Sequence, residues 1–236
     1  SAKVLSMANS AIYGSTSQIT DVNMAVVRLG RIDVKTIAMT LFVSNMLKKF
    51  KLKNISIDHY WKHNLAVAFL CRKISSNYKP ISDISEEQKT TLYLSGLLHD
   101  IGYILFDQIN PEFFQSVKEK AIETHESFIE LEKIVMKTTH AHEGAELLKY
   151  WNLPNILCDT VRYHHEPVIP EDNNLKAYAE ILNVADYFAN SMDISNLSEI
   201  DSDIRSEIAW SNFDLAEMDT DSFEKFKNDL FSQTKL

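Results

Sequence analysis

The stretch "GLLHDIGYIL", residues 96–105, places a His-Asp doublet inside an otherwise apolar run. Burying two ionisable side chains side by side is costly unless each of them finds a partner. His99 and Asp100 therefore either hold a metal ion or persist as hydrogen-bonded polar groups of the core. The apolar residues around the doublet predict a central helix that is covered on every side.

The residues before the doublet indicate where this helix begins. Ser85 is followed three residues later by Gln88, which is the pattern of a capping box. Apolar residues then continue on nearly every face as far as Phe106, so one long helix is expected through the doublet. Adjacent residues on a helix point about 100° apart. The doublet could therefore bind one ion from two directions, or Asp100 could bridge two ions.

The rest of the chain also has the pattern of an all-α protein. Its 236 residues include only five glycines and five prolines, and the apolar residues recur at intervals of three and four rather than in alternation. A hydrophobic content of 45% is enough for a sizeable core. We therefore expect a multi-helix globular domain.

Charge and cysteine content restrict the partners and the compartment. A formal net charge of −9 repels phosphate backbones and anionic lipid, so neither nucleic acid nor a membrane is expected as a direct partner. Cys71 and Cys158 lie far apart in apolar helical contexts, and we find neither an amino-terminal signal nor an apolar span of about 18 residues. The sequence predicts a cytoplasmic protein.

Several further ionisable residues fall at positions that look buried, on helices far apart in the sequence. They are His63, His140, His164, His165 and Asp186. Imidazole and carboxylate groups together suit Mn, Fe, Co, Ni or Zn, and helical cores often build one- or two-metal sites from one or two ligands per helix. Together with the doublet, this set predicts a metal site.

Each of these residues also has a simpler interpretation. A lone inward histidine such as His63 is more often a hydrogen-bonded core residue than a ligand, and His164 and His165 are also typical of a helix C-terminus. The remaining histidines are expected at the surface or along helix seams: His59, His125 and His142. The set as a whole favours metal binding more strongly than any single member does.

The first helices allow one other interpretation. Asp21 is a candidate N-cap and Gly30 a candidate C-terminal cap, so two helices joined by a short turn are expected here, as in a helix-turn-helix motif. The second helix, residues 34–50, carries Ile37 and Leu41 where a groove-reading helix needs polar side chains, which disfavours DNA recognition.

Five motifs in order along the chain resemble the HDOD domain, a signalling-output relative of the HD phosphohydrolases. They are "ANSAIYG" with "AVVRLG", "WKHNLAVA", "GLLHDIG", "HAHEGAELLKYWNLP" and "RYHH". The resemblance covers roughly residues 1–170 and implies an all-helical HDOD domain over residues 1–192. This domain comprises an amino-terminal helical part, residues 1–55, and an HD-like core, residues 56–192. An acidic helical extension is expected over residues 193–236, and the missing opening helices of the family suggest a chain that begins inside its domain.

The resemblance also implies roles for the ionisable residues. His99, Asp100 and Asp186 match the positions that hold the core ion in the HD superfamily. The positions added in two-metal relatives such as the HD-GYP phosphodiesterases are matched by His63, His140, His164 and His165. The cofactor expected from this match is a divalent ion, Fe, Mn or Zn, and Asp100 is the expected catalytic residue if the domain is active.

Two departures from active HD-GYP relatives shape the expected function. Tyr103 stands where those enzymes have a lysine for substrate phosphate, and "PVIPEDNN" replaces their Gly-Tyr-Pro loop after Glu166. We therefore expect a bacterial signalling output or scaffold domain that is regulatory, lacks efficient catalysis and binds signalling proteins. The alternative is a metal-dependent phosphohydrolase acting on a nucleotide or a cyclic dinucleotide.

Overall fold

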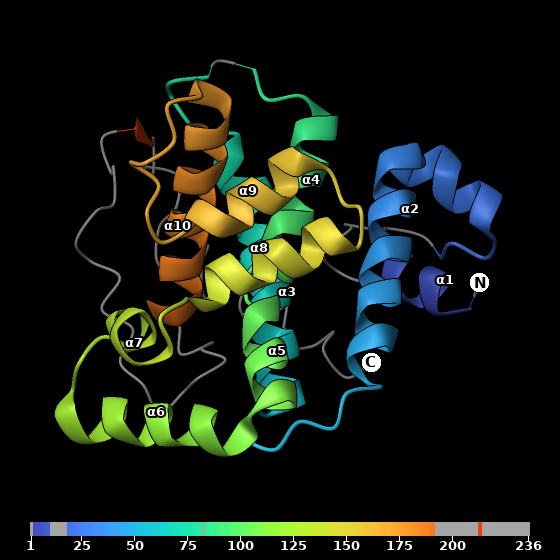
Figure 1. Ribbon diagram of the computed structural model, residues 1–236. Coiled ribbons are helices and arrows are strands. Elements are labelled where there is room, and N and C mark those ends of the chain that lie inside the picture. Colours follow the sequence, from blue (N-terminus) through green and yellow to red (C-terminus); the bar gives the residue numbers. More distant parts are fainter. Residues whose placement is uncertain (1, 10–17, 82, 192–211, 214–236) are drawn as a thin grey trace. The chain divides into compact units, whose positions relative to one another are not determined.

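The computed structural model describes residues 2–9, 18–81, 83–191 and 212–213, and within these ranges the regular secondary structure is entirely helical (Figure 1). The predicted all-α class is confirmed. The described residues up to Lys49 belong to one compact unit, and those from Phe50 belong to a second. Most of the predicted extension, residues 193–236, lies outside the described residues. No described helix is long and apolar enough to cross a membrane.

The first unit contains α1 (Ala2–Ala8) and α2 (Val22–Leu47), which pack against each other. The Asp21 side chain caps α2 by accepting a hydrogen bond from the backbone N–H of Met24, as expected for an N-cap. Gly30 interrupts α2 with a φ of 85°, a left-handed conformation that glycine adopts without a steric penalty. The predicted break between two helices is therefore present as a kink at Gly30.

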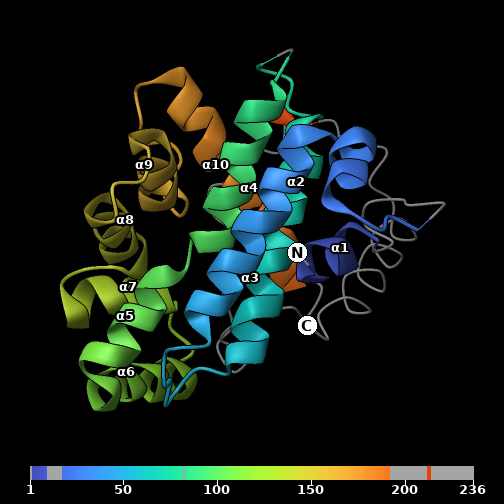
Figure 2. The ribbon, with the colours of Figure 1, turned by 90° about the vertical axis from the view of Figure 1, so that its right-hand side faces the viewer.

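The second unit contains two helices of 19 residues each and several shorter ones (Figure 1). Its main helices are α3 (Ile57–Ser75), α4 (Glu86–Leu98), α5 (Ile101–Ile109), α8 (His140–Tyr150), α9 (Asn155–Tyr163) and α10 (Asn173–Ser191). Helix α3 packs along both α4 and α10, while α8 packs on α5 and α9. Figure 2 shows α3 and α4 side by side from a second direction.

Three further elements connect α5 to α8: α6 (Pro111–Thr124), the short α7 (Phe128–Leu131) and a π-helix, η2 (Glu132–Met136). Asp107 at the end of α5 accepts hydrogen bonds from the backbone N–H groups of Lys53 and Asn54. Lys118 on α6 donates to the carbonyl oxygen of Asn54. These contacts attach the loop before α3 to α5 and α6.

The single helix expected through the doublet is in fact two helices. The Ser85–Gln88 capping box is present, but α4 ends at Leu98 and α5 begins at Ile101. Asp100 lies between them with φ −98° and ψ 13°, in the sparsely populated bridge region that often holds active-site residues. The physical reason lies in α8, because the Gly102 backbone packs so closely on His140 that a Cβ there would overlap the His140 carbonyl oxygen.

Candidate metal centre

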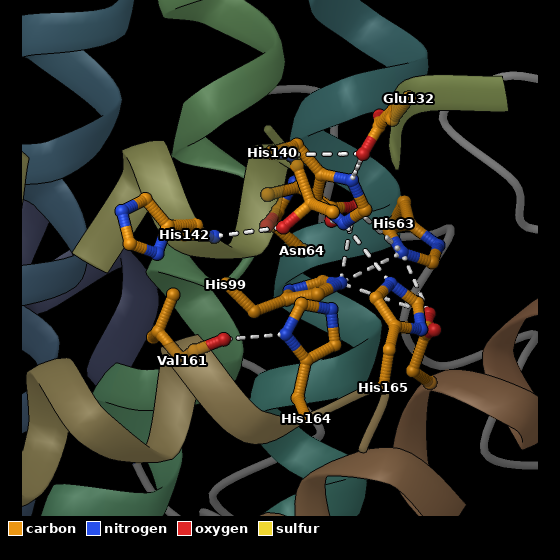
Figure 3. A network of polar contacts seen from close by, with 12 residues as sticks. His63, Asn64, His99, Glu132, His140, His142, Val161, His164 and His165 are labelled. Carbon is orange, nitrogen blue, oxygen red and sulfur yellow. Dashed lines mark hydrogen bonds and ion pairs between the residues drawn. The ribbon is translucent and has the colours of Figure 1, made fainter. Parts of the chain in front are cut away.

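The seven residues predicted as ligands converge in the middle of the second unit (Figure 3). All are buried except the partly buried His165, and Asp100 and Asp186 are each only 4% exposed. They come from the second turn of α3, the α4–α5 junction, the start of α8, the residues directly after α9, and the interior of α10. The structure therefore gathers side chains from five separate segments.

Three of these residues form what we call the first cluster: His63, His99 and Asp186. Each offers one donor atom, and the three atoms lie within 4.8 Å of one another. His63 Nε2 is 3.1 Å from Asp186 Oδ1 and 3.3 Å from His99 Nε2. Two imidazoles and a carboxylate at this spacing are suited to one divalent cation.

The second cluster is made of His140, His164 and His165, whose donor atoms also lie within 4.8 Å of one another. His140 Nε2 and His165 Nε2 are 3.0 Å apart. The rings of His164 and His165 have centroids 3.9 Å apart, and His164 meets His140 edge-on at 5.4 Å. Three imidazoles facing one another form a ligand set that is typical of Zn or Fe.

Asp100 faces both clusters through its two oxygens. Oδ2 lies 3.0 Å from His99 Nε2 and 3.4 Å from His63 Nε2, whereas Oδ1 lies 3.3 Å from His140 Nε2. One carboxylate thus stands between the clusters in the way that a bridging ligand would. The bend between α4 and α5, rather than the geometry of a continuous helix, gives it this position.

Three of the histidines are oriented by hydrogen bonds from their outer ring nitrogens, and Figure 3 shows those of His140 and His164. His99 Nδ1 donates to the Gly96 carbonyl oxygen at 2.8 Å, and His164 Nδ1 donates to the Val161 carbonyl oxygen at 2.6 Å. His140 Nδ1 lies 2.8 Å and 2.9 Å from the two carboxylate oxygens of Glu132. Because each Nδ1 donates outwards, each ring turns its Nε2 towards the clusters.

Glu132 is a functional candidate that the sequence analysis missed. It is completely buried at the start of the π-helix, and besides the His140 ring it accepts a hydrogen bond from the backbone N–H of His140. The signal was faint: Glu132 lies four residues after the buried Phe128 and next to the buried Leu131. That spacing puts it on the apolar face of a helical segment.

One buried atom tests directly whether the residues fit a metal. Among the described residues, His164 Nε2 is fully buried and has no hydrogen-bond partner, although its Nδ1 is satisfied. A buried imidazole lone pair without a donor is unusual in a core. One ring nitrogen of His164 lies within 4.8 Å of donor atoms of both His140 and His165. This donor set fits a divalent cation.

Electrostatics separates His63 and His99 from His164 and His165. Burial alone would lower the pKa of His63 and of His99, but Asp100 and Asp186 outweigh it and raise these pKa values to about 9 and about 10. Burial, reinforced by neighbouring histidines, lowers the pKa of His164 far below its usual value and that of His165 to about 3. The second cluster therefore keeps two neutral imidazoles, the form that binds metal.

Tyr103 lies beside the second cluster, and three other histidines lie at the surface. The Tyr103 ring stacks on His140 with centroids 4.0 Å apart and an interplanar angle of 22°, and it is buried. The prediction for the other histidines is confirmed, since His59, His125 and His142 are exposed. Arg162, a basic residue near the second cluster in sequence, is engaged with His142 and Glu146.

Comparisons with known proteins bear on the family and the fold. A family model described as HDOD domain matches residues 1–167. A curated but uncharacterized protein of Treponema pallidum (strain Nichols) is 26% identical over 170 residues, which are 72% of this chain and 32% of that protein. The chain thus spans about a third of the length of this relative.

The solved structures that are similar to the whole chain include the following two. The HDOD domain protein with unknown function from Geobacter sulfurreducens gives a TM-score of 0.82 at 22% identity, with 100% of this chain and 82% of that one covered. A "putative signal transduction protein" from Marinobacter aquaeolei VT8 gives a TM-score of 0.71 at 22% identity, covering 99% of this chain and 51% of that one. At this identity the likeness establishes a shared fold.

Proposed function

The chain belongs to the HDOD domain family, and from that membership we propose that it is a regulatory signalling module organised around a buried divalent metal centre. The observation that carries the proposal is the convergence of two donor clusters on the two oxygens of Asp100. The first cluster with Asp100 offers two imidazoles and two carboxylates, and the second offers three imidazoles and a carboxylate. Iron, manganese and zinc all accept such mixed sets.

A metal centre of this kind would act mainly as a structural and regulatory element. Its ligands come from segments that are far apart in the sequence. A bound cation would therefore stabilise the packing of α3, α8 and α10 around the α4–α5 junction. Tyr103 packs over His140 and leaves this side of the centre apolar. Such enclosure favours a domain that signals through its surface to protein partners.

The signalling role has support from two directions. The HDOD resemblance implies an output or scaffold domain, and the Marinobacter structure of the same fold carries a signal-transduction name. The acidic character of the chain, with a net charge of −9, favours protein partners over nucleic acid or anionic membranes. We propose signalling proteins as the partners and a cytoplasmic setting.

One observation favours a second candidate, a metal-dependent phosphohydrolase. Asp100 faces both clusters, as a bridging ligand does in two-metal hydrolases, where bound ions supply an activated water and neutralise phosphoryl oxygens. Here Asp100 would hold the geometry, while Glu132 would fix the proton of His140 on Nδ1. The buried Tyr103 supplies no positive charge for a phosphate, which leaves this candidate second.

The test is a metal analysis of protein purified without chelator or a nickel column. We expect one or two equivalents of iron, manganese or zinc in the wild type and none in Asp100→Ala. The exposed His59 provides a matched control, because His59→Ala removes an imidazole that no cluster uses and should keep the metal. A metal-free wild type that does not take up added metal would refute the proposal.

The same preparation distinguishes the two candidates. Metal-loaded protein is incubated with cyclic dinucleotides and nucleotides, and hydrolysis of the phosphoester is measured. Turnover that disappears in Asp100→Ala would replace the regulatory proposal by the phosphohydrolase. Metal binding without turnover is the result expected for the regulatory module.

A further inference from the structure

We infer that Glu132 is a positioning residue for the second cluster and that, through the π-helix it begins, metal occupancy alters the wall of an apolar surface pocket. This inference rests on the proposed metal centre and deepens it by naming a route from the site to the surface. It is carried by three features: the contacts of Glu132, the backbone between Glu132 and His140, and the lining of the pocket.

Both carboxylate oxygens of Glu132 contact His140. Oε1 and Oε2 lie 2.9 Å and 2.8 Å from His140 Nδ1, and Oε2 also accepts the His140 backbone N–H at 2.9 Å. The same carboxylate therefore fixes the ring of His140 and the first residue of α8. Figure 3 shows Glu132 on the side of the His140 ring away from the other histidines.

The charge of Glu132 suits a cation on the opposite ring nitrogen. A carboxylate that accepts the outer N–H of a ligand histidine makes the other nitrogen more basic, and losing such a partner typically weakens metal binding by about 10- to 100-fold. Glu132 would thus strengthen binding at His140 Nε2.

The backbone between these two residues adopts two uncommon conformations. Residues Glu132–Met136 form a single π-helical turn, a rare element that is frequent at functional sites. Lys137, directly after it, has a φ of 60°, which is uncommon for a residue other than glycine. Such backbone persists when surrounding contacts fix it, and the hydrogen bonds that Glu132 accepts from His140 join the two ends of the segment 132–140.

The far end of this turn forms part of a surface pocket of about 240 Å³. Met136, the last residue of the π-helix, lines it, as does Glu143 on the first turn of α8. The other lining residues are Leu105, Phe106, Ile109, Asn110 and Phe113. Met136 lies four residues after Glu132, and Glu143 lies three residues after His140. A change that orders the His140 ring would therefore also affect this side of the pocket.

The first experiment is a calorimetric titration with Mn²⁺. The wild type should bind two equivalents, and Glu132→Gln, which keeps the size and a carbonyl acceptor, should weaken one of them by about 10- to 100-fold and leave the other unchanged. The matched control is Glu130→Gln, which removes an exposed carboxylate from the same segment. A role limited to folding would instead shift both affinities together.

The second experiment needs no variant. Hydrogen exchange of the wild type, followed by mass spectrometry with and without Mn²⁺, should show several-fold slower exchange of amides 132–137 when metal is present. The start of α4, residues 86–90, lies at the opposite end of that helix from the doublet and should not change. Together the two experiments cover both the positioning role and the route to the pocket.

Each outcome has a distinct meaning. A wild type that binds two equivalents while Glu132→Gln binds both with unchanged affinity overturns the positioning role alone. Metal binding that leaves exchange at 132–137 unaltered overturns the route to the pocket. A wild type that binds no Mn²⁺ overturns the proposed metal centre itself, and the inference with it.

Discussion

The two clusters differ in the part of the fold that holds their ligands. The first cluster takes His63 and Asp186 from the interiors of α3 and α10, two helices of 19 residues each. The second cluster takes all of its histidines from helix ends, since His140 begins α8 and His164 and His165 follow the last residue of α9. Similar ligand sets are thus held mainly by helix interiors in the first cluster and by helix ends in the second.

This difference shows how a ligand can be held in place. A side chain in a helix interior is oriented by the periodicity of its helix and by packing. A side chain at a helix end needs additional contacts, and here Glu132 orients His140 while the Asn183 side chain donates to the His164 carbonyl oxygen. We therefore expect the second cluster to be the more easily disrupted of the two.

The largest effect is expected where the clusters meet. Asp100→Ala removes the carboxylate that contacts both of them, so both ions should be lost. A ligand at 1,000 times its Kd stabilises a protein by about 4 kcal/mol, and this metal-linked stability should vanish. Thermal unfolding measured with and without chelator should show a large shift in melting temperature for the wild type and none for the variant. A variant whose melting temperature still falls in chelator would mean that the clusters hold metal without Asp100.

The next effect contrasts one histidine from each cluster. His63→Ala removes one imidazole partner from each of the buried carboxylates Asp100 and Asp186, which should cost about 3–5 kcal/mol. Replacing the neutral, partly buried His165 by alanine should lower the free energy of unfolding by only about 1 kcal/mol. Urea unfolding of the two variants in chelator measures this difference, and equal losses would argue against the contrast between the clusters.

Two glycines offer a more local test. A Cβ at Gly102 would overlap the His140 carbonyl oxygen, and a Cβ at Gly96 would lie 2.8 Å from the Cα of Ala68 on α3. Each alanine substitution should cost about 1–3 kcal/mol through overpacking. Gly102→Ala should release metal from the second cluster, and Gly96→Ala should release metal from the first. Metal titration of the two variants measures this. Loss of the same ion in both variants would contradict the assignment.

The smallest effect serves as a control for stability alone. Ser85→Ala removes the capping box of α4 at the end remote from the doublet, and loss of an N-cap typically costs about 1 kcal/mol. The metal content should not change. A variant that loses both stability and metal would mean that modest destabilisation by itself empties the centre, and the glycine results would then need reinterpretation.

Much of this arrangement could be predicted from local sequence patterns. The helices follow from apolar periodicity, the start of α4 follows from its capping box, and the inward position of His63 follows from the stripe along α3. These features depend on residues within one or two turns of each other. The convergence of the predicted ligands then follows, because buried ionisable groups must meet one another.

The features that could not be predicted depend on contacts between distant segments. The break between α4 and α5 depends on the close packing of Gly102 against His140, 38 residues later in the chain. Glu132 stands near other acidic residues such as Glu130 and looks like part of a solvated face. It begins a π-helix, an element too rare for the sequence pattern to predict.

The spread of the ligands along the chain has a consequence for how the protein folds. The seven residues run from His63 to Asp186, so the centre is made almost entirely of contacts with high sequence separation. Such contacts form after the local helices, because each requires a long loop to close first. We expect tight ion binding only once α10 has docked, so that uptake of the metal marks the completion of folding in this unit.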